Sequence, residues 1–187
     1  EKPTMKSRII LPLVAVVLSL SSALIGSAQT PASEMGWSVP DAFVAPLIDS
    51  HGNTIGHAAI ADTDEGVAAV VLVQGLTPGE HGIHLHSVGV CDPALEKPFD
   101  SAGSHFNPGE MHHGMHAGDI GNLTGDANGN AVYMFGSTSW SLDDGLFGLA
   151  DEDGTALVIH ESVDDLATDP SGNSGARIAC AVLVPPA

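Results

Sequence analysis

The sequence predicts an antiparallel all-β sandwich or barrel made of one domain. Three observations favour this fold: short apolar runs recur along the chain, clusters of Gly, Asn and Asp separate them, and no stretch after residue 40 keeps a helical period. The 187 residues are the length of a single domain. Because aromatic residues are only 4% of the chain, the core must consist mainly of Val, Ile, Leu and Ala.

Eight apolar runs are expected to be strands, because each has the length of a strand and turn-forming residues lie beside it. The first run is followed by D-S-H-G-N and the second by A-D-T-D-E-G, while the third precedes Q-G-L-T-P-G. Such regular spacing is typical of sandwiches and barrels. The expected strands cover residues 42–48, 55–60, 67–73, 81–86, 122–124, 131–135, 156–160 and 177–184.

Two long segments without a strand pattern, 87–121 and 161–176, are expected to be functional loops. Loops of this length inside a compact domain usually carry function. The first contains Cys91 and four candidate metal ligands, and the second contains Asp164 and the approach to Arg177. We therefore expect a site built by loops on a rigid β scaffold.

The N-terminal segment is expected to be a secretory signal peptide. Residues 5–8 (M-K-S-R) form a short cationic start, residues 9–25 are largely apolar, and residues 26–28 are small. This pattern predicts cleavage before Gln29. An uncleaved membrane anchor is the alternative, since the apolar run is nearly long enough to span a bilayer. The polar residues that follow favour cleavage.

The expected organisation is an upstream remnant with the signal peptide at 1–28, a flexible lead-in at 29–40 and one domain at 41–187. This signal peptide predicts that the protein is periplasmic or secreted and has no membrane partner after cleavage. The chain has two cysteines, Cys91 and Cys180, and an even number in an exported chain predicts one disulfide. Two free buried thiols are the alternative. A disulfide closing so long a loop would stabilise the fold by roughly 4 kcal/mol.

The charge of the chain excludes one class of partner. The formal net charge is −18, with only five Lys or Arg residues. Phosphate binding needs clustered Lys and Arg, so a nucleic-acid partner is excluded. Without residues 1–28 the chain would keep 22 acidic and 2 basic residues, a net charge of −20. The acidic residues are spread rather than blocked, which favours a soluble, self-repelling surface over an acidic interaction tail.

The main functional signal is a set of six histidines and one aspartate in four short segments: H-L-H, S-H-F-N-P, H-H-G-M-H-A-G-D and L-V-I-H-E. Six imidazoles and one carboxylate are enough for two metal ions if one histidine is shared. The sequence therefore predicts a dinuclear metal centre. The candidate ligands are His84, His86, His105, His113, His116, Asp119 and His160.

The ligand types divide this set into two sites. His84 and His86 lie two residues apart on a strand, so they point to the same face, and His160 ends another apolar run. With His105 they offer four imidazole nitrogens, which suit Cu(II). Three nitrogens and one oxygen form a closed tetrahedral set that suits Zn(II), and His105 would bridge the two metals. The zinc set is His105, His113, His116 and Asp119.

Two further residues have open roles. Asp164 lies four residues after His160; a carboxylate there that accepted an N–H from a ligand of each metal would fix both rings. A plain solvated loop acid fits Asp164 equally well. His112 is adjacent to His113 and could exchange roles with it. The remaining histidines have no partner motif and are interpreted as ordinary turn or strand residues: His51, His57 and His81.

Taken together, these segments resemble the copper/zinc superoxide dismutases, specifically the exported bacterial type. The resemblance covers about residues 41–184, in the family's order. The matching stretches are 79–86 (G-E-H-G-I-H-L-H), 91–93 (C-D-P), 100–108 (D-S-A-G-S-H-F-N-P), 113–119 (H-G-M-H-A-G-D), 157–161 (L-V-I-H-E) with 164–165 (D-D), and 169–180 (D-P-S-G-N-S-G-A-R-I-A-C).

The resemblance implies an eight-stranded Greek-key β-barrel, an immunoglobulin-like sandwich with two long functional loops. It implies dismutation of superoxide to dioxygen and hydrogen peroxide, with one copper and one zinc per chain in the two ligand sets above. It also implies that Cys91 pairs with Cys180. Arg177 would lie over the copper, and His105 would carry a proton during turnover.

Two features depart from the family. The spacing from His113 to His116 is shorter than in eukaryotic members, so the zinc loop is trimmed. The family often gathers several cations around the copper channel, whereas only Arg177 and Lys97 are present here after residue 28. Members occur as monomers and as homodimers, and the sequence favours neither state.

Three other functions are alternatives to the dismutase. A secreted copper/zinc-binding carrier without turnover would need neither Arg177 nor a bridging histidine. A zinc hydrolase would need a general-base Glu beside a histidine pair, and four nitrogens on one metal leave little room for a reactive water. A structural or adhesive β-sandwich does not explain seven ligands in family order.

Overall fold

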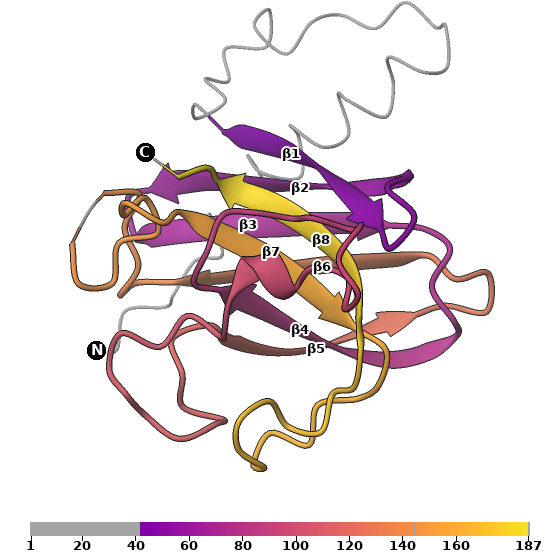
Figure 1. The fold of residues 1–187 in the computed structure, drawn as a ribbon. Coiled ribbons are helices and arrows are strands. Elements are labelled where there is room, and N and C mark those ends of the chain that lie inside the picture. The colour runs from indigo at the N-terminus through magenta and orange to yellow at the C-terminus, as the bar shows by residue number, and fades with distance from the viewer. Residues whose placement is uncertain (1–41, 144, 187) are drawn as a thin grey trace, which may run out of the picture.

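The computed structural model describes residues 42–143 and 145–186, which form an eight-stranded antiparallel barrel (Figure 1). The described residues contain no α-helix and one short 3-10 helix, Asp100–Ala102. The prediction of an all-β barrel is therefore confirmed. The strands are β1 Phe43–Asp49, β2 Thr54–Thr63, β3 Gly66–Val73, β4 Gly79–His86, β5 Asp119–Gly125, β6 Ala131–Ser137, β7 Thr155–His160 and β8 Arg177–Val184.

The strand order is β5-β4-β7-β8-β1-β2-β3-β6, and every pairing is antiparallel. β3 pairs with β6 and β4 with β7, so the chain crosses between distant strands in Greek-key fashion. The end strands β5 and β6 lie beside each other without a hydrogen-bonded ladder. There, the Tyr133 hydroxyl on β6 donates to the Ile120 carbonyl on β5, which joins the two edges of a nearly closed barrel.

The barrel interior is filled by alternate aliphatic side chains of the strands. On β3, Val67, Ala69 and Val71 belong to the core cluster, while the intervening residues point to the opposite face and pack in a second, smaller buried cluster. Leu85 on β4 and Leu157 on β7 expose none of their surface. Burying such a side chain contributes about 1.5–3 kcal/mol, so the few aromatic residues do not prevent a stable core.

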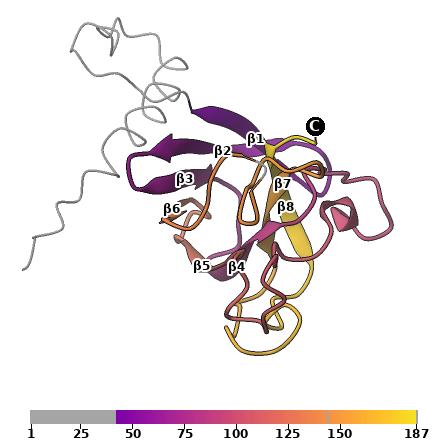
Figure 2. The same ribbon diagram turned by 90° about the vertical axis from the view of Figure 1, so that its left-hand side faces the viewer.

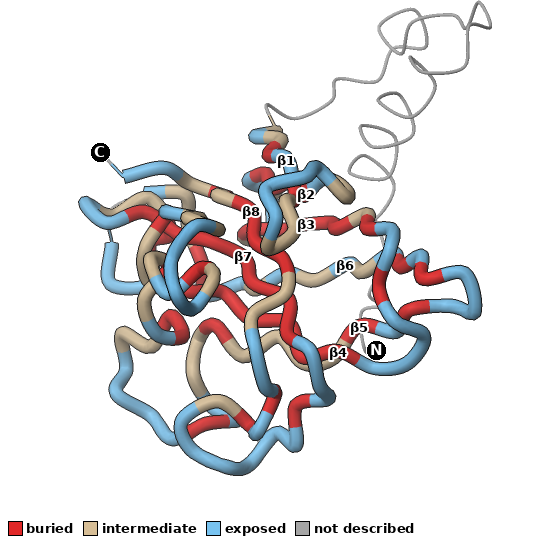
Figure 3. Tube along the Cα trace, turned by 45° about the vertical axis from the view of Figure 1, so that its right-hand side comes forward, coloured by how far each residue is buried: buried red, intermediate tan, exposed pale blue. Residues whose placement is uncertain are grey.

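β7 is buried on both of its faces, as its continuous red colour in Figure 3 shows. One face belongs to the barrel core, and on the other face Ala156 and Val158 pack against Phe99 and Ala102 from the loop after β4. Figure 2 shows this loop, with its 3-10 helix, standing beside β7 and β8. The loop is therefore a packed layer on the barrel, and it can hold functional side chains rigidly.

A disulfide joins this loop to the barrel. Cys91 in the loop is bonded to Cys180 on β8, and their Cα atoms are 5.7 Å apart. The expected disulfide is therefore present, and the alternative of two free thiols is wrong. The bond closes a loop between residues 89 positions apart. It fixes the start of the long loop against the strand pair that also carries His160 and Arg177.

Seven of the eight strands differ from the sequence predictions at one or both ends, by one to three residues, and the change at β5 also shortens a loop. The first long loop ends at residue 118 rather than 121, because β5 begins at Asp119. The strand expected at 122–124 is accordingly longer, since pairing with β4 extends it to both sides. Within the described residues, no helix is long and apolar enough to cross a membrane. The signal peptide expected at 1–28 and the lead-in expected at 29–40 lie outside the described residues.

Candidate metal centre

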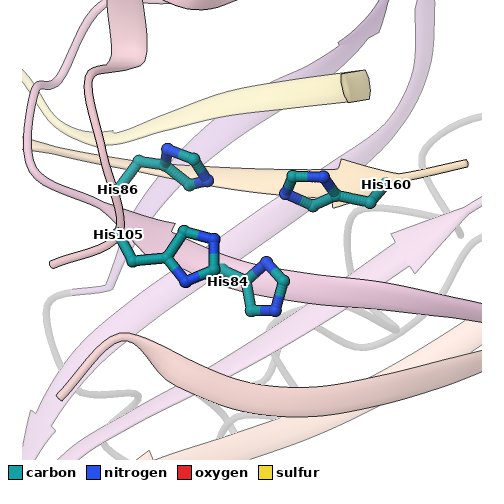
Figure 4. Close-up of side chains that lie close together, drawn as sticks. All are labelled: His84, His86, His105 and His160. Carbon is teal, nitrogen blue, oxygen red and sulfur yellow. The ribbon is translucent and has the colours of Figure 1, made fainter. Parts of the chain in front are cut away.

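Four histidines meet on the outer side of β4 and β7 (Figure 4). Ile83 and Leu85 of β4 point into the core, so the alternating His84 and His86 point outward, toward the loop layer. β4 pairs with β7, which ends at His160. The backbone of His105 forms an isolated bridge with that of His86, which places the loop histidine beside the strand pair. All four side chains are almost completely buried.

The ring nitrogens that face one another in this group have no hydrogen-bond partner. They are His84 Nδ1 and the Nε2 atoms of His86, His105 and His160. A buried polar nitrogen without a hydrogen-bond partner destabilises the folded protein. A metal ion is the partner that several converging nitrogen lone pairs could share. Four imidazole nitrogens suit copper, so the residues present fit the group that the sequence indicates.

The opposite nitrogens of three of these rings donate outward, which fixes the tautomer and leaves the inward lone pair free. His84 Nε2 donates to Asp164 Oδ2 at 2.7 Å, and His86 Nδ1 donates to the Gly103 carbonyl at 3.0 Å. His160 Nδ1 donates to the Gly175 carbonyl at 3.3 Å. These three rings are therefore oriented toward the shared centre by their own hydrogen bonds.

A second group forms around one carboxylate oxygen. Asp119 Oδ1 lies 2.8 Å from His105 Nδ1, 3.1 Å from His116 Nδ1 and 3.4 Å from His113 Nδ1. The other oxygen, Oδ2, accepts the backbone N–H groups of Gly114 and His116, which holds the carboxylate in place. Three nitrogens and one oxygen converge there, and this is a ligand set for zinc.

His105 belongs to both groups, because its two nitrogens face in opposite directions. Nδ1 faces Asp119, whereas Nε2 is one of the unpartnered atoms of the four-histidine group. The structure thus brings together all seven candidate ligands and shares one ring between the two groups. His112 is not among them: it lies at the surface, where Nδ1 contacts Asp169 Oδ2 at 2.8 Å.

Asp164 connects the two groups from behind. Its Oδ2 accepts from His84 Nε2 at 2.7 Å and its Oδ1 from His113 Nε2 at 2.8 Å, and its side chain is fully buried. The alternative of a solvated loop acid is therefore wrong. The side-chain amide of Asn122 on β5 donates to the Asp164 carbonyl and accepts its N–H. Gly172 lies so close that an added Cβ would collide with Asp164 Oδ1.

Arg177 begins β8 opposite His160. Its guanidinium donates to the carbonyls of Phe99 and Gly103, at 2.6 and 2.7 Å. Since His86 donates to the same Gly103 carbonyl, one backbone group positions both the arginine and a ring of the four-histidine group. Burial lowers the pKa of Arg177, although Asp100 opposes this effect, and a guanidinium stays charged at neutral pH in any case.

The sequence interpretation missed two positioning residues. His81 is a buried strand residue whose Nδ1 contacts the His160 carbonyl at 2.8 Å and whose Nε2 contacts the Thr77 carbonyl at 2.9 Å. Asp169 accepts the backbone N–H of His113 at 2.6 Å. Both residues lie in the matching stretches, His81 in 79–86 and Asp169 in 169–180, but no motif marks their role, because their contacts join positions far apart in the chain.

Burial sets the electrostatics of the centre. It lowers the pKa of His84 to about 4, with help from the charge of His105, and lowers the pKa of His160 to about 3, with help from His84. Burial also holds the pKa of His86 well below its usual range. Burial alone would raise the pKa of Asp119, but the hydrogen bond from His105 and the nearby histidine charges lower it to about 2. Neutral rings and an ionised carboxylate are the forms that bind metals.

These shifts make the stability of the metal-free protein depend on pH. The unfolded chain takes up protons on His84 and His160 near pH 6.5, whereas in the folded chain burial lowers their pKa values to about 4 and about 3. Burial lowers the pKa of His86 as well. The stability present above pH 6.5 should therefore fall as the pH drops from 6.5 toward 4. Thermal unfolding of chelator-treated protein across this range measures it. An unfolding midpoint that stays constant from pH 7 to pH 4.5 would show that burial does not lower the pKa values of these histidines.

The fold is a nearly closed antiparallel barrel, and it carries two histidine groups that share one ring. These features place the protein in a class, the dinuclear metal-binding β-barrels. Comparison with known proteins gives the particular family. The family model described as copper/zinc superoxide dismutase (SODC) matches residues 54–183. The chain belongs to the copper/zinc superoxide dismutase family.

Two relatives show the range of the family: one is named as a superoxide dismutase, and the other is named only as superoxide dismutase-like. A Cu-Zn superoxide dismutase of Aquifex aeolicus is 40% identical over 147 residues, covering 74% of this chain and 84% of the relative. The superoxide dismutase-like protein YojM of Bacillus subtilis is 38% identical over 147 residues and 74% of each chain.

Solved structures give the same result. The crystal structure of a superoxide dismutase-like protein from Bacillus subtilis superposes with a TM-score of 0.69 and 37% identity, over 75% of this chain and 97% of that chain. The Cu/Zn superoxide dismutase from Brucella abortus superposes with a TM-score of 0.61 and 25% identity, over 76% and 99% of the two chains.

Proposed function

We propose that the protein is an active copper/zinc superoxide dismutase that works outside the cytoplasm, of the exported bacterial type. The observation that carries the proposal is the set of four inward, unpartnered ring nitrogens with Arg177 fixed beside them. We assign one copper per chain to His84, His86, His105 and His160. We assign one zinc per chain to His105, His113, His116 and Asp119, so that His105 bridges the two metals.

When bound, copper would supply one-electron chemistry, through which one superoxide is oxidised to dioxygen and a second is reduced and takes two protons to give hydrogen peroxide. Arg177 would bind the superoxide anion by charge and by the N–H groups not used on Phe99 and Gly103. His105 would hold a proton at Nε2 between the two halves of the cycle, because its Nδ1 is occupied on the Asp119 side.

Asp164 supports the proposed site by fixing one ring of each group. His84 is assigned to copper and His113 to zinc, and both donate to this single carboxylate. Hydrogen bonds from buried His84 and His113 keep Asp164 ionised: burial acts to raise its pKa, but these bonds lower it. We infer that this residue sets the orientation of both ligand groups together.

The overall charge should shape the rate at which superoxide arrives. Only Lys97 and Arg177 are basic after residue 28, against a formal net charge of −18 for the whole chain. Global repulsion of the substrate anion should offset local attraction at Arg177, so that kcat/KM is flat or rises modestly as salt increases. The salt dependence of kcat/KM is measured by generating superoxide in a pulse and following its decay in buffers of increasing ionic strength. A steep fall with salt would show instead that local positive charge dominates.

A copper/zinc-binding carrier without turnover is the second candidate, since one relative is named only as superoxide dismutase-like. A carrier has no use for an arginine held beside the four-histidine group. Superoxide turnover by protein loaded with copper and zinc, compared with protein loaded with zinc alone, tests the proposal. Turnover that needs copper supports the enzyme, whereas full metal loading without turnover supports the carrier.

A further inference from the structure

The loop that carries His113 and His116 also holds exposed donor atoms that neither metal group uses. Its sequence M-H-H-G-M-H contains Met111, His112 and Met115, which lie outside the seven assigned ligands. Met111 exposes 46% and Met115 59% of its surface, and the His112 side chain is 86% exposed. Two large apolar side chains and an imidazole are thus held in solvent within one short turn.

The backbone of this turn is fixed, so these side chains start from defined positions. The Asn107 side chain accepts the N–H of Met111 at 3.0 Å and donates to its carbonyl at 2.9 Å. The N–H of Met115 donates to the His112 carbonyl at 3.1 Å and closes the turn. Met111 and Met115 line the same open cavity, of about 620 Å³. The two methionines therefore border one space, and His112, which does not line it, lies in the same turn.

His112 is oriented in the same way as the buried ligands. Its Nδ1 lies 2.8 Å from Asp169 Oδ2, and donation to a carboxylate places the ring proton on Nδ1. Nε2 is then left with a free lone pair in solvent. Carboxylate-supported histidines of this kind are typical of metal ligands, because the hydrogen bond fixes the tautomer and raises the basicity of the other nitrogen.

We propose that Met111, Met115 and His112 Nε2 form a surface site for Cu(I), which receives the ion before it passes to the buried four-histidine group. Thioether sulfur is a soft ligand and selects Cu(I) over zinc, calcium or magnesium. The site adjoins His113 in the chain, so it lies at the edge of the metal centre. This inference rests on the proposed function only in that the buried group is taken to be the copper site.

Packing is the competing explanation of the two methionines. The same cavity is lined by Phe135, Trp140 and Phe147, and thioethers contact aromatic rings favourably. A packing role predicts that the sulfur atoms can be replaced by carbon without any effect on copper, because leucine has a similar volume. The conservative change Met→Leu therefore separates the two explanations.

The first experiment uses protein already loaded with zinc and reduced copper, so that both buried groups are filled. Anaerobic titration with Cu(I) against a chromophoric Cu(I) chelator should reveal one further equivalent per chain, with copper–sulfur scattering in the X-ray absorption spectrum. The double variant Met111→Leu/Met115→Leu should lose that equivalent. Met134→Leu is the matched control, because Met134 is 43% exposed on β6, outside the loop. No further equivalent, or an equivalent that survives in the double variant, would overturn the proposal.

The second experiment measures transfer. Metal-free protein is mixed with a Cu(I)–chelator complex, and the appearance of copper in the buried group is followed with time. The double variant and His112→Gln should load several-fold more slowly than the parent and Met134→Leu, while reaching the same final copper content. Equal loading rates would overturn the role in delivery. Neither readout depends on turnover, so a loaded protein that fails to dismutate superoxide would remove the proposed function and leave the surface site standing.

Discussion

Replacing Arg177 with alanine is expected to lower kcat/KM for superoxide by about 10- to 100-fold. The reason is the loss of a charge-assisted hydrogen bond to the anion, which contributes roughly 1.5–3 kcal/mol, where about 1.4 kcal/mol corresponds to a factor of ten. Steady-state turnover of the copper- and zinc-loaded variant measures the effect. Metal content should stay the same, because no nitrogen of Arg177 belongs to either ligand group.

A lysine at the same position provides the control for Arg177→Ala. Arg177→Lys keeps the positive charge but not the planar fork that donates to Phe99 and Gly103, so partial recovery of the rate is expected. Recovery in the lysine variant would assign the loss to charge rather than to collapse of the loop. An alanine variant with an unchanged kcat/KM and full metal content would remove Arg177 from the mechanism.

Changing Asp164 to asparagine is expected to weaken the retention of both metals by about 10- to 100-fold, the usual effect of removing a carboxylate that orients ligand histidines. Asparagine keeps the shape but can accept from only one of His84 and His113. The other ring then loses its fixed tautomer. Metal content after a timed challenge with chelator measures the effect for copper and for zinc separately.

Asp62→Asn makes the same change of charge at an exposed position on β2 and is the matched control. It should retain both metals as the parent does. Loss of one metal alone in the Asp164→Asn variant would show that the carboxylate supports only one group. Retention of both metals would show that the two rings are held by other contacts.

Much of the fold could be predicted because its signals are local. The strands follow from apolar runs and adjacent turn residues, and many short strands in one domain predict a sandwich or a barrel. The choice of an eight-stranded Greek-key barrel came from the family resemblance. Strand ends were less predictable, since pairing with a neighbour decides them. β5 begins at Asp119, a residue that also belongs to the zinc-type ligand group, so one position serves both the sheet and the site.

The candidate ligands were predictable because each lies in a short segment with donor residues at meaningful spacing. His84 and His86 share a strand face by their two-residue spacing alone. The contacts that orient them join positions far apart in sequence. The sequence left Asp164 open between orienting two rings and being a solvated loop acid, and it gave no sign of the contact between His86 and Gly103. The burial of Asp164 likewise depends on how Asn122 and Gly172 close around it, which no local pattern reveals.

The most direct test of the account is superoxide turnover by the protein loaded with copper and zinc, measured beside its His160→Ala variant. His160 offers one of the four unpartnered nitrogens and has no part in the Asp119 group. The account expects fast, copper-dependent turnover in the parent and its loss in the variant, while zinc content is kept. Full copper and zinc binding by the parent without any turnover would contradict it and identify a metal carrier instead.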